Sequence, residues 1–459
     1  MAKIKQRPEY HFTPQKGWIN DPNGLYFLNG FNHILYQANR SHTHWASPSI
    51  GHARTKDFIH FVEMDDAVCP DSAYDLSDEG GCFSGSIINK DARLFLVYTG
   101  SVNSGENLSQ SQNLAVSLDG VHFEKYLGNP IIPTPPPESD LNFRDPKVFE
   151  HDSKYYMVTG CRKNGHIAIF LYSSMDLIHW GYQGVLYEGN GEDGTLAECP
   201  DLYPIHDDYW LLTFSPEHHR KGIRSLGIIG KVDLEGCSFS PCRNIPLDYG
   251  LDYYARQSYR IGSRRISIAW LNQWPWMTHF QNHGNTTEEG WCGCLGMPRE
   301  ETYDGGSIKN YPVEEVVQSF KLYKRDKLTI KSVDSITLKA KSSSFLLSLS
   351  LPRKEMECGE ITVKTASFTF LINVERSYIV VIPMGKNSSV IPISDKETTV
   401  IDFFFDNSVL EMFVDGGEES GTWIFERTEE KTELEFLVKQ KSCQIEYSLS
   451  YLEETDEFC

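Results

Sequence analysis

A repeat of about sixty residues runs through the first two thirds of the chain and limits what the chain can fold into. Four segments resemble one another, the last more weakly: 51–61, 114–123, 171–180 and 229–234. Their equivalent aspartates are spaced 62, 57 and 57 residues apart: Asp57, Asp119, Asp176 and Asp233. Short apolar runs before the later copies predict buried strands, at 94–98, 155–158 and 209–212. Repeated short strands are typical of β-propeller blades, and about 300 residues at about 60 per blade predict roughly five blades.

After residue 300 the pattern changes. Residues 312–320 follow a proline and predict a short helix. Further on, 344–350 and 399–405 predict strands, and turn residues such as Asp415, Gly416 and Gly417 separate such runs. We therefore expect an all-β protein in three parts: a five-bladed propeller (1–305), a linker with a short helix (306–328) and a β-sandwich (329–459).

Three acids share one local context. Asp21 precedes Pro22 and Asp145 precedes Pro146, which favours an extended backbone at each aspartate, and Glu198 lies two residues before Pro200. A single acid of this kind is more often a solvated loop residue. These three are 124 and 53 residues apart, about two blades and one blade. Because equivalent strands converge on the channel of a propeller, we expect the three carboxylates to meet at one mouth of it.

Composition narrows the class of function. The formal net charge of −20 argues against nucleic acid or an anionic membrane as the main partner. Aromatic residues make up 12% of the chain, which suits stacking on sugar rings but also suits any β-rich protein. The first residues lack the apolar core of a signal peptide, and no run is long enough to span a membrane, so we expect a cytoplasmic protein. The 11 cysteines favour reduced thiols, and Cys292 and Cys294 alone make a weak metal motif.

In its repeat, its three acids and the motifs around them, the chain resembles glycoside hydrolase family 32, the β-fructofuranosidases. Matching motifs occur in the family's order across residues 8–300: 18–24, Tyr36 with Gln37, 83–86, 144–147, 198–201, 252–255, Gly290 with Trp291, and 298–300. The resemblance implies a five-bladed propeller followed by a β-sandwich, in agreement with the repeat.

The resemblance also implies roles for the three acids. Asp21 would be the nucleophile, Glu198 the general acid and then base, and Asp145, with Arg144, a ligand of fructose hydroxyls that favours the transition state. A retaining glycosidase needs two carboxyl groups about 5–5.5 Å apart, one of them protonated. Clustered carboxylates raise the pKa of one member, and Arg144 would help to keep Asp145 ionised.

Further positions match the family's sugar pocket. Asn20, Gln37 and Ser84 would bind sugar hydroxyls, and Trp45, Phe83 and Trp270 would form pocket walls. Asp252 and Tyr254 match one more pocket segment, although a strand aromatic such as Trp270 is more often a core residue. No metal and no organic cofactor is implied.

Two departures concern the leaving group. Ile50 stands where the family usually has a second Trp, and Ala197 precedes Glu198 where the family commonly has Trp. The expected substrate is sucrose or sucrose 6-phosphate, and a phosphate would need basic residues, for which Arg40, His42 and His44 are candidates. Short fructans, fructosyl transfer and a non-catalytic carbohydrate-binding propeller are the alternatives. The sequence does not indicate the oligomeric state.

Overall fold

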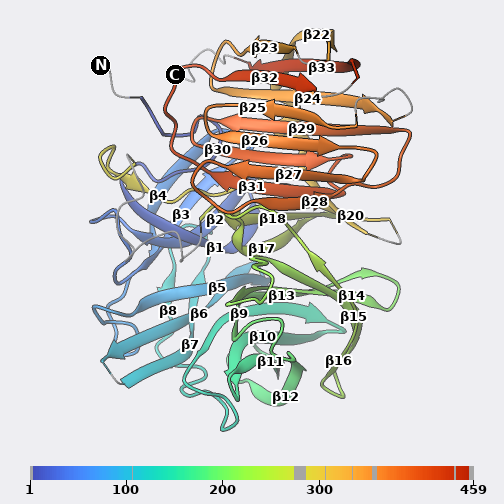
Figure 1. Cartoon of the computed structure of the whole chain (residues 1–459). Helices are drawn as coiled ribbons and strands as arrows, with labels where there is room; N and C mark the ends of the chain where they lie inside the picture. The colour runs from blue at the N-terminus through green and yellow to red at the C-terminus, as the bar shows by residue number, and fades with distance from the viewer. Residues whose placement is uncertain are drawn as a thin grey trace.

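The protein folds almost entirely into β-strands. The computed structural model describes residues 4–105, 107–272, 286–304, 307–332, 334–353, 359–438 and 441–453. Within these ranges the strands form seven sheets, and one short helix, α1 (Glu314–Gln318), is present. Figure 1 shows the first five sheets, blue to green, below the two sheets of the C-terminal part, orange to red. The expectation of an all-β protein is confirmed.

Five sheets follow one another along the N-terminal part, and neighbouring strands are antiparallel except for β19 and β1. The first is β19(Trp291–Cys292)-β1(Gly17–Leu28)-β2(Phe31–Asn39)-β3(Ser49–Thr55)-β4(Phe61–Val68). The second is β5(Gly81–Lys90)-β6(Arg93–Ser104)-β7(Asn107–Ser117)-β8(Glu124–Lys125). The third is β9(Phe143–His151)-β10(Lys154–Lys163)-β11(His166–Ser174)-β12(Gly181–Glu188). The fourth is β13(Leu196–His206)-β14(Tyr209–Glu217)-β15(Leu226–Asp233)-β16(Ser238–Pro246), and the fifth is β17(Tyr254–Ile261)-β18(Arg264–Trp270)-β20(Arg299–Tyr303)-β21(Ile308–Pro312).

The first strands of these sheets meet one another in a closed circle. β1 contacts β5, β5 contacts β9, β9 contacts β13, β13 contacts β17, and β17 returns to β1. Apolar side chains fill the space between neighbouring sheets: Val158 of the third sheet and Leu212 of the fourth, both fully buried, belong to one cluster. Side chains at the inner ends of the sheets are therefore held close to one another.

The sequence repeat is a turn that recurs in successive sheets. Asp176 lies between β11 and β12, and its Oδ1 accepts the backbone N–H groups of Ile178 and His179 at 2.9 and 2.8 Å. Its Oδ2 lies 2.7 Å from Nδ1 of His179. Asp57 and Asp119 make the same contacts with residues two and three places further on. The repeated aspartates thus close the turns β3–β4, β7–β8 and β11–β12, which join the last two strands of the first three sheets.

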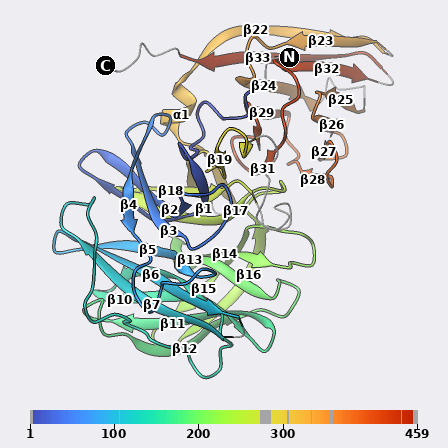
Figure 2. The same cartoon turned by 90° about the vertical axis from the view of Figure 1, so that its left-hand side faces the viewer.

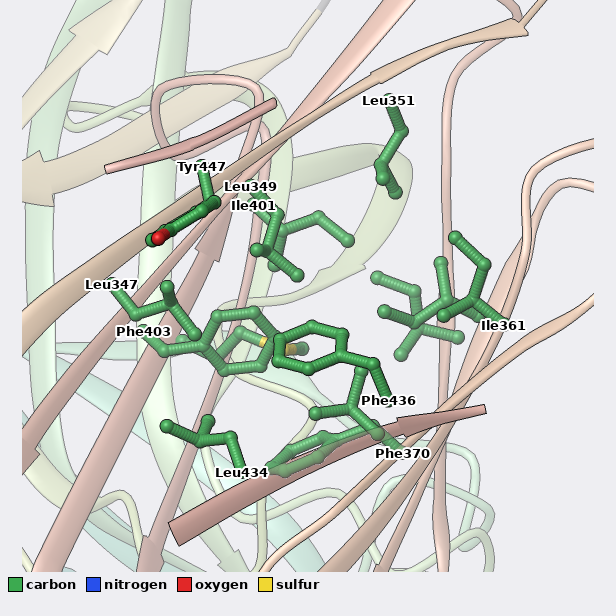
Figure 3. Packing of buried hydrophobic residues seen from close by; sticks show 14 of the residues in the cluster. Leu347, Leu349, Leu351, Ile361, Phe370, Ile401, Phe403, Leu434, Phe436 and Tyr447 are labelled. Atoms are coloured by element: carbon green, nitrogen blue, oxygen red, sulfur yellow. The ribbon is translucent and has the colours of Figure 1, made fainter. Parts of the chain in front are cut away.

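The C-terminal part consists of two six-stranded sheets. One is β22(Phe320–Ile330)-β33(Cys443–Leu452)-β24(Ser344–Pro352)-β29(Thr398–Asp406)-β30(Val409–Val414)-β31(Glu419–Ile424). The other is β23(Ser335–Lys339)-β32(Glu433–Val438)-β25(Ile361–Lys364)-β26(Phe368–Asn373)-β27(Tyr378–Pro383)-β28(Ser389–Pro392). Both sheets contribute to one apolar core, in which Phe403 of β29 meets Phe370 of β26 edge-on at 5.1 Å between ring centres (Figure 3).

The predicted linker at 306–328 has more structure than we expected. Its residues 308–312 form β21 of the fifth sheet, and β22 of the C-terminal part begins at Phe320. Between them lies α1, which confirms the predicted short helix and carries Glu314 and Glu315 in its first turn, where acids are favourable. The predicted boundary between 305 and 306 lies outside the described residues.

A buried network of charges joins the two parts of the chain, which also lie against each other in Figure 2. Arg299 of β20 is fully buried, and its guanidinium contacts Asp248, at 3.0 Å, and Glu411 of β30. His11 lies between Asp406, at 2.8 Å, and Glu411, at 3.0 Å. Burial lowers the pKa of His11, but its bonds to the two carboxylates outweigh burial and raise the pKa to about 9.

Glu411 is therefore expected to stabilise the whole molecule. Glu411→Gln leaves two buried cations, Arg299 and His11, without one of their anions, and we expect the free energy of unfolding to fall by about 3–5 kcal/mol. Urea denaturation at pH 7 measures this change. Glu188→Gln is a matched control in a half-exposed pair with Lys163, and we expect a change within about 1 kcal/mol. Equal effects of the two substitutions would contradict the assignment.

Candidate active site

A cavity of about 460 Å³ lies among the inner strands of the N-terminal sheets. Seven of the residues predicted from the sequence line it: Asp21, Gln37, Trp45, Phe83, Arg144, Glu198 and Tyr254. They come from strands of all five sheets and from the segment between β2 and β3. The ring of sheets thus gathers positions more than 200 residues apart in the sequence around one space.

Asp21 lies on β1 where the pairing with β2 shifts its register, between Ile19 and Pro22. Its side chain is held by two donors, because Nε2 of Gln37 and Oγ of Ser84 each lie 3.3 Å from Oδ2. Burial, reinforced by the negative charge of Glu198, raises the pKa of Asp21 to about 6. Asp21 is thus an oriented carboxylate that ionises close to neutral pH.

Asp145 lies on β9 with a positive backbone φ of 60°, an uncommon conformation for a residue other than glycine. The extended backbone predicted for this residue before Pro146 is therefore wrong. Its Oδ2 accepts the backbone N–H of Cys199 at 2.8 Å, and its own N–H donates to Thr99 at 3.0 Å. Burial raises the pKa of Asp145 to about 7, and Arg144 opposes this rise without cancelling it. Asp145 is not among the residues that line the cavity.

Glu198 of β13 is fixed at both oxygens. Its Oε1 accepts hydrogen bonds from Nε and Nη2 of Arg144, at 3.1 and 2.9 Å. Its Oε2 accepts the hydroxyl proton of Tyr254 at 2.5 Å. Arg144 therefore binds Glu198, and it also opposes the rise in the pKa of Asp145, the neighbour on which the sequence predicted that it would act.

Cys199 brings the aspartates together. Its thiol is buried and lies 3.7 Å from Oδ2 of Asp21 and 3.6 Å from Oδ2 of Asp145. Burial raises the pKa of this thiol far above its usual range, so the thiol stays protonated and can donate to either carboxylate. The three predicted acids thus lie in one cluster, and Asp21 and Glu198 face one cavity.

Comparison with known proteins identifies the family. The family model described as "Glycosyl hydrolases family 32 N-terminal domain" matches residues 11–312. The chain belongs to glycoside hydrolase family 32. Its relatives include the sucrose-6-phosphate hydrolase of Escherichia coli, 34% identical over 69% of this chain and 67% of that protein. The raffinose invertase of Escherichia coli is 34% identical over 67% of this chain and 65% of that protein.

Solved structures agree with this membership. The family 32 β-fructofuranosidase BmSUC1 of Bombyx mori is 25% identical, with a TM-score of 0.81 over 98% of this chain and 95% of that one. The sucrose-6-phosphate hydrolase of Lactobacillus gasseri has the same fold, with a TM-score of 0.85 at 24% identity over 98% of this chain and 93% of that one. Family and relatives together make this protein a β-fructofuranosidase, a glycoside hydrolase.

Four other predicted site residues of this family 32 chain lie outside the lining of the cavity. Asn20 is buried and accepts a hydrogen bond from the indole of Trp18 at 2.8 Å, and Ser84 bridges Gln37 and Asp21. Trp270 and Asp252 are buried as well. Trp270 packs against Trp18 and Tyr254, with ring centres 6.0 and 6.4 Å apart.

Asp252 is directed to the C-terminal part of the chain. It accepts the N–H of Ile424 at 3.0 Å and lies 3.4 Å from Nζ of Lys386. The two departures from the family pattern are buried too: Ile50 and Ala197 belong to apolar clusters between sheets. Arg40 is bound by Glu63 and Asp66 at 2.7 and 2.5 Å and is not among the lining residues.

Sequence reasoning missed several residues that line the cavity: Glu79, Glu217, His218 and Arg224. Glu217 ends β14, and its Oε1 lies 3.7 Å from Nη2 of Arg144. Burial, with the charge of Glu198, raises the pKa of Glu217. No motif marks these positions: Glu217, His218 and Arg224 lie at or beyond the end of β14 in the fourth sheet, and Glu79 lies just before β5 of the second sheet.

Within the described ranges, no helix is long and apolar enough to cross a membrane. No cluster of three or more His, Cys, Asp or Glu side chains suited to a metal ion occurs in that part of the chain either.

Proposed function

We propose that this protein is a retaining hydrolase of the β-fructofuranosyl bond of sucrose or sucrose 6-phosphate. The observation that carries the proposal is the pair of Asp21 and Glu198 on one cavity, each oriented by its own hydrogen-bond donors. The names of the relatives support it, as does a solved complex of a BmSUC1 mutant with sucrose.

The first step makes a covalent intermediate. An oxygen of Asp21 attacks the anomeric carbon of the fructosyl unit, and the bond from that carbon to the glucosyl oxygen breaks. Glu198 gives its proton to that oxygen, so the glucosyl part leaves as an alcohol. The product is an ester between Asp21 and the fructosyl unit.

The second step releases fructose. Glu198, now a carboxylate, takes a proton from water, and the water oxygen attacks the anomeric carbon. The ester bond breaks and Asp21 leaves as a carboxylate. Arg144 and Tyr254 hold Glu198 in one orientation through both steps, while Gln37 and Ser84 do the same for Asp21.

The remaining predicted residues bind the sugar in this proposal. Asp145 favours the transition state through the fructose hydroxyls, and Asn20 is a further hydroxyl ligand. Trp45 and Phe83, whose rings meet edge-on at 5.9 Å, form a wall of the pocket. Trp270 supports Tyr254, since the two rings pack edge-on, and Asp252 fixes this segment to the C-terminal part through Ile424 and Lys386.

The proposed architecture is a five-bladed propeller that carries the catalytic residues, followed by a β-sandwich. The closed circle of contacts from β1 through β5, β9, β13 and β17 supports the propeller. The shared apolar core of the last two sheets supports the sandwich. Since β21 ends at Pro312 and β22 begins at Phe320, the division lies at α1.

Fructose release tests the proposed function. Purified protein is incubated with sucrose and, separately, with sucrose 6-phosphate, and free fructose is measured against time. Release from either substrate supports the proposal. Release from neither, by folded protein at micromolar concentration, would overturn it in favour of fructan hydrolysis or sugar binding without catalysis.

The pH dependence of the reaction gives a second test. Asp21 must be ionised to attack, and its pKa is raised to about 6. We therefore expect kcat/KM to fall as the pH drops through about 6, by about tenfold per pH unit below it. A pH–rate profile from pH 4 to 8 measures this limb. An acid limb near the ordinary aspartate pKa of about 4 would contradict the assignment.

A further inference from the structure

The active-site cavity borders a second cleft. This cleft has a volume of about 950 Å³ and is lined on one side by residues 219–224, between β14 and β15. On its other side lie Asn387 and Ser388 of the C-terminal part. Arg224 lines both the active-site cavity and the second cleft, so its side chain lies between the two.

The residues between β14 and β15 are unusually basic for a chain with a net charge of −20. Five of the seven positions from 218 to 224 carry basic side chains: His218, His219, Arg220, Lys221 and Arg224. The segment directly follows Glu217, which lies close to Arg144 and therefore to Glu198. The positive charges of Arg220, Lys221 and Arg224 thus lie in a segment that begins beside the acid that would protonate the leaving group.

The acids of the second cleft do not neutralise this charge at Arg224. Glu192 is bound to Arg220 at 3.0 Å, and Asp248 is bound to Arg299 at 3.0 Å. Asp193 accepts the hydroxyl proton of Tyr187 at 2.8 Å. Each carboxylate that lines the cleft therefore has a partner of its own.

Arg224 differs from the other arginines around the site. Arg144 binds Glu198, and Arg40 binds Glu63 and Asp66. Arg224 is half-buried, and its Nε has no hydrogen-bond partner among the described residues. The charge of Asp252 acts on Arg224, but the carboxylate of Asp252 is bound by Lys386 and by the N–H of Ile424. Withdrawing a guanidinium from water without an anion bonded to it is unfavourable, and a bound anion would supply that partner.

We propose that Arg224 binds the phosphate of a phosphorylated glucosyl leaving group and thereby makes the enzyme prefer sucrose 6-phosphate over sucrose. This rests on the proposed function, because it concerns the leaving group of that reaction. The leaving group must lie on the same side of the cavity as the general acid, Glu198. Arg224 lies on that side, because it is close to Tyr254, whose hydroxyl donates a hydrogen bond to Glu198. A guanidinium matches the geometry of phosphate oxygens and can bind two of them at once.

The test compares kcat/KM for the two substrates in the wild type and in two variants. We expect the wild type to favour sucrose 6-phosphate by at least about tenfold. Arg224→Gln should lower the ratio of the two kcat/KM values by about ten- to a hundredfold. Arg220→Gln removes the same charge from the same segment, but its guanidinium is held by Glu192, and the ratio should change by less than about twofold.

Product inhibition gives an independent readout. Glucose 6-phosphate should compete with substrate more strongly than glucose in the wild type, and Arg224→Gln should remove this difference. If Arg224→Gln does not fold, Arg224→Lys replaces it: the charge stays and the two-point contact is lost, so a smaller fall in the ratio is expected.

The outcomes separate this inference from the proposed function. Equal kcat/KM for both substrates in the wild type overturns the phosphate site and leaves the fructosidase intact. A ratio that Arg224→Gln does not change, or that Arg220→Gln lowers equally, overturns the role of Arg224. Cleavage of neither substrate overturns the proposed function itself.

Discussion

Asp21→Asn is expected to lower kcat for fructose release by about 10⁴- to 10⁶-fold, which is the range seen when a catalytic nucleophile is removed. The amide has no charge to stabilise the developing positive charge on the fructosyl unit, and it is a poor nucleophile at the anomeric carbon. Initial rates of fructose release measure the effect. Asp119→Asn makes the same chemical change in an exposed turn between β7 and β8, and its kcat should match the wild type.

Stability measurements show whether the Asp21 variant is folded. Because the folded-state pKa of Asp21 is raised to about 6, its contribution to stability is present below the unfolded value of about 4 and is lost as the pH rises through 6. Asn at this position avoids that loss. We expect the Tm of the variant at pH 8 to equal or exceed that of the wild type, with the difference vanishing near pH 4. A lower Tm at pH 8 would contradict the role of burial at this site.

Glu198→Gln is expected to lower kcat for sucrose by about 10³- to 10⁴-fold, since general acid catalysis and base catalysis are both lost. The decrease in the rate of the first step should be smaller for a fructoside with a nitrophenol leaving group, because that group departs without a proton. Azide should then raise the rate and yield fructosyl azide, since azide attacks without help from a base. Rates with both substrates, with and without azide, measure these effects.

Glu217→Gln is the matched comparison for Glu198→Gln. Glu217 lines the same cavity and lies 3.7 Å from the same arginine, but the hydroxyl of Tyr254 donates its hydrogen bond to Glu198. Its loss of activity should be at least about tenfold smaller than that of Glu198→Gln. If azide instead rescues only Glu217→Gln, Glu217 is the acid and Glu198 is not.

Local sequence was sufficient to predict much of this molecule. The turns at Asp57, Asp119 and Asp176 form from contacts within four residues, so each copy of the repeat carries its own structural information. Asp21, Asp145 and Glu198 were predicted to meet because their spacing follows the period of the sheets, and their mutual electrostatic effects place them in one cluster.

Contacts between distant segments were not predictable in the same way. Arg144 precedes Asp145 in sequence and opposes the rise in its pKa, but the pairing of β9 with β10 shifts register at this point, and the guanidinium of Arg144 bonds to Glu198 of β13. Asp252 lies two residues before Tyr254, yet it bonds to Ile424. The guanidinium of Arg224 belongs to a segment without a motif, so its approach to the cavity depends on how β14 and β15 pack.

The buried contacts of the N-terminal segment have a consequence for the order in which the protein is made. The carboxylate of Asp406 accepts the backbone N–H groups of Glu9, Tyr10 and His11 at 2.7, 2.9 and 3.0 Å. During synthesis Glu9, Tyr10 and His11 cannot make these bonds until Asp406, 395 to 397 residues further along, has been added. A fragment that stops after β21 would lack Asp406 and Glu411, so His11 would lose both of its carboxylates and Arg299 would lose one of its two. The match to the family model ends at residue 312, but the unit that can complete its folding extends through both C-terminal sheets.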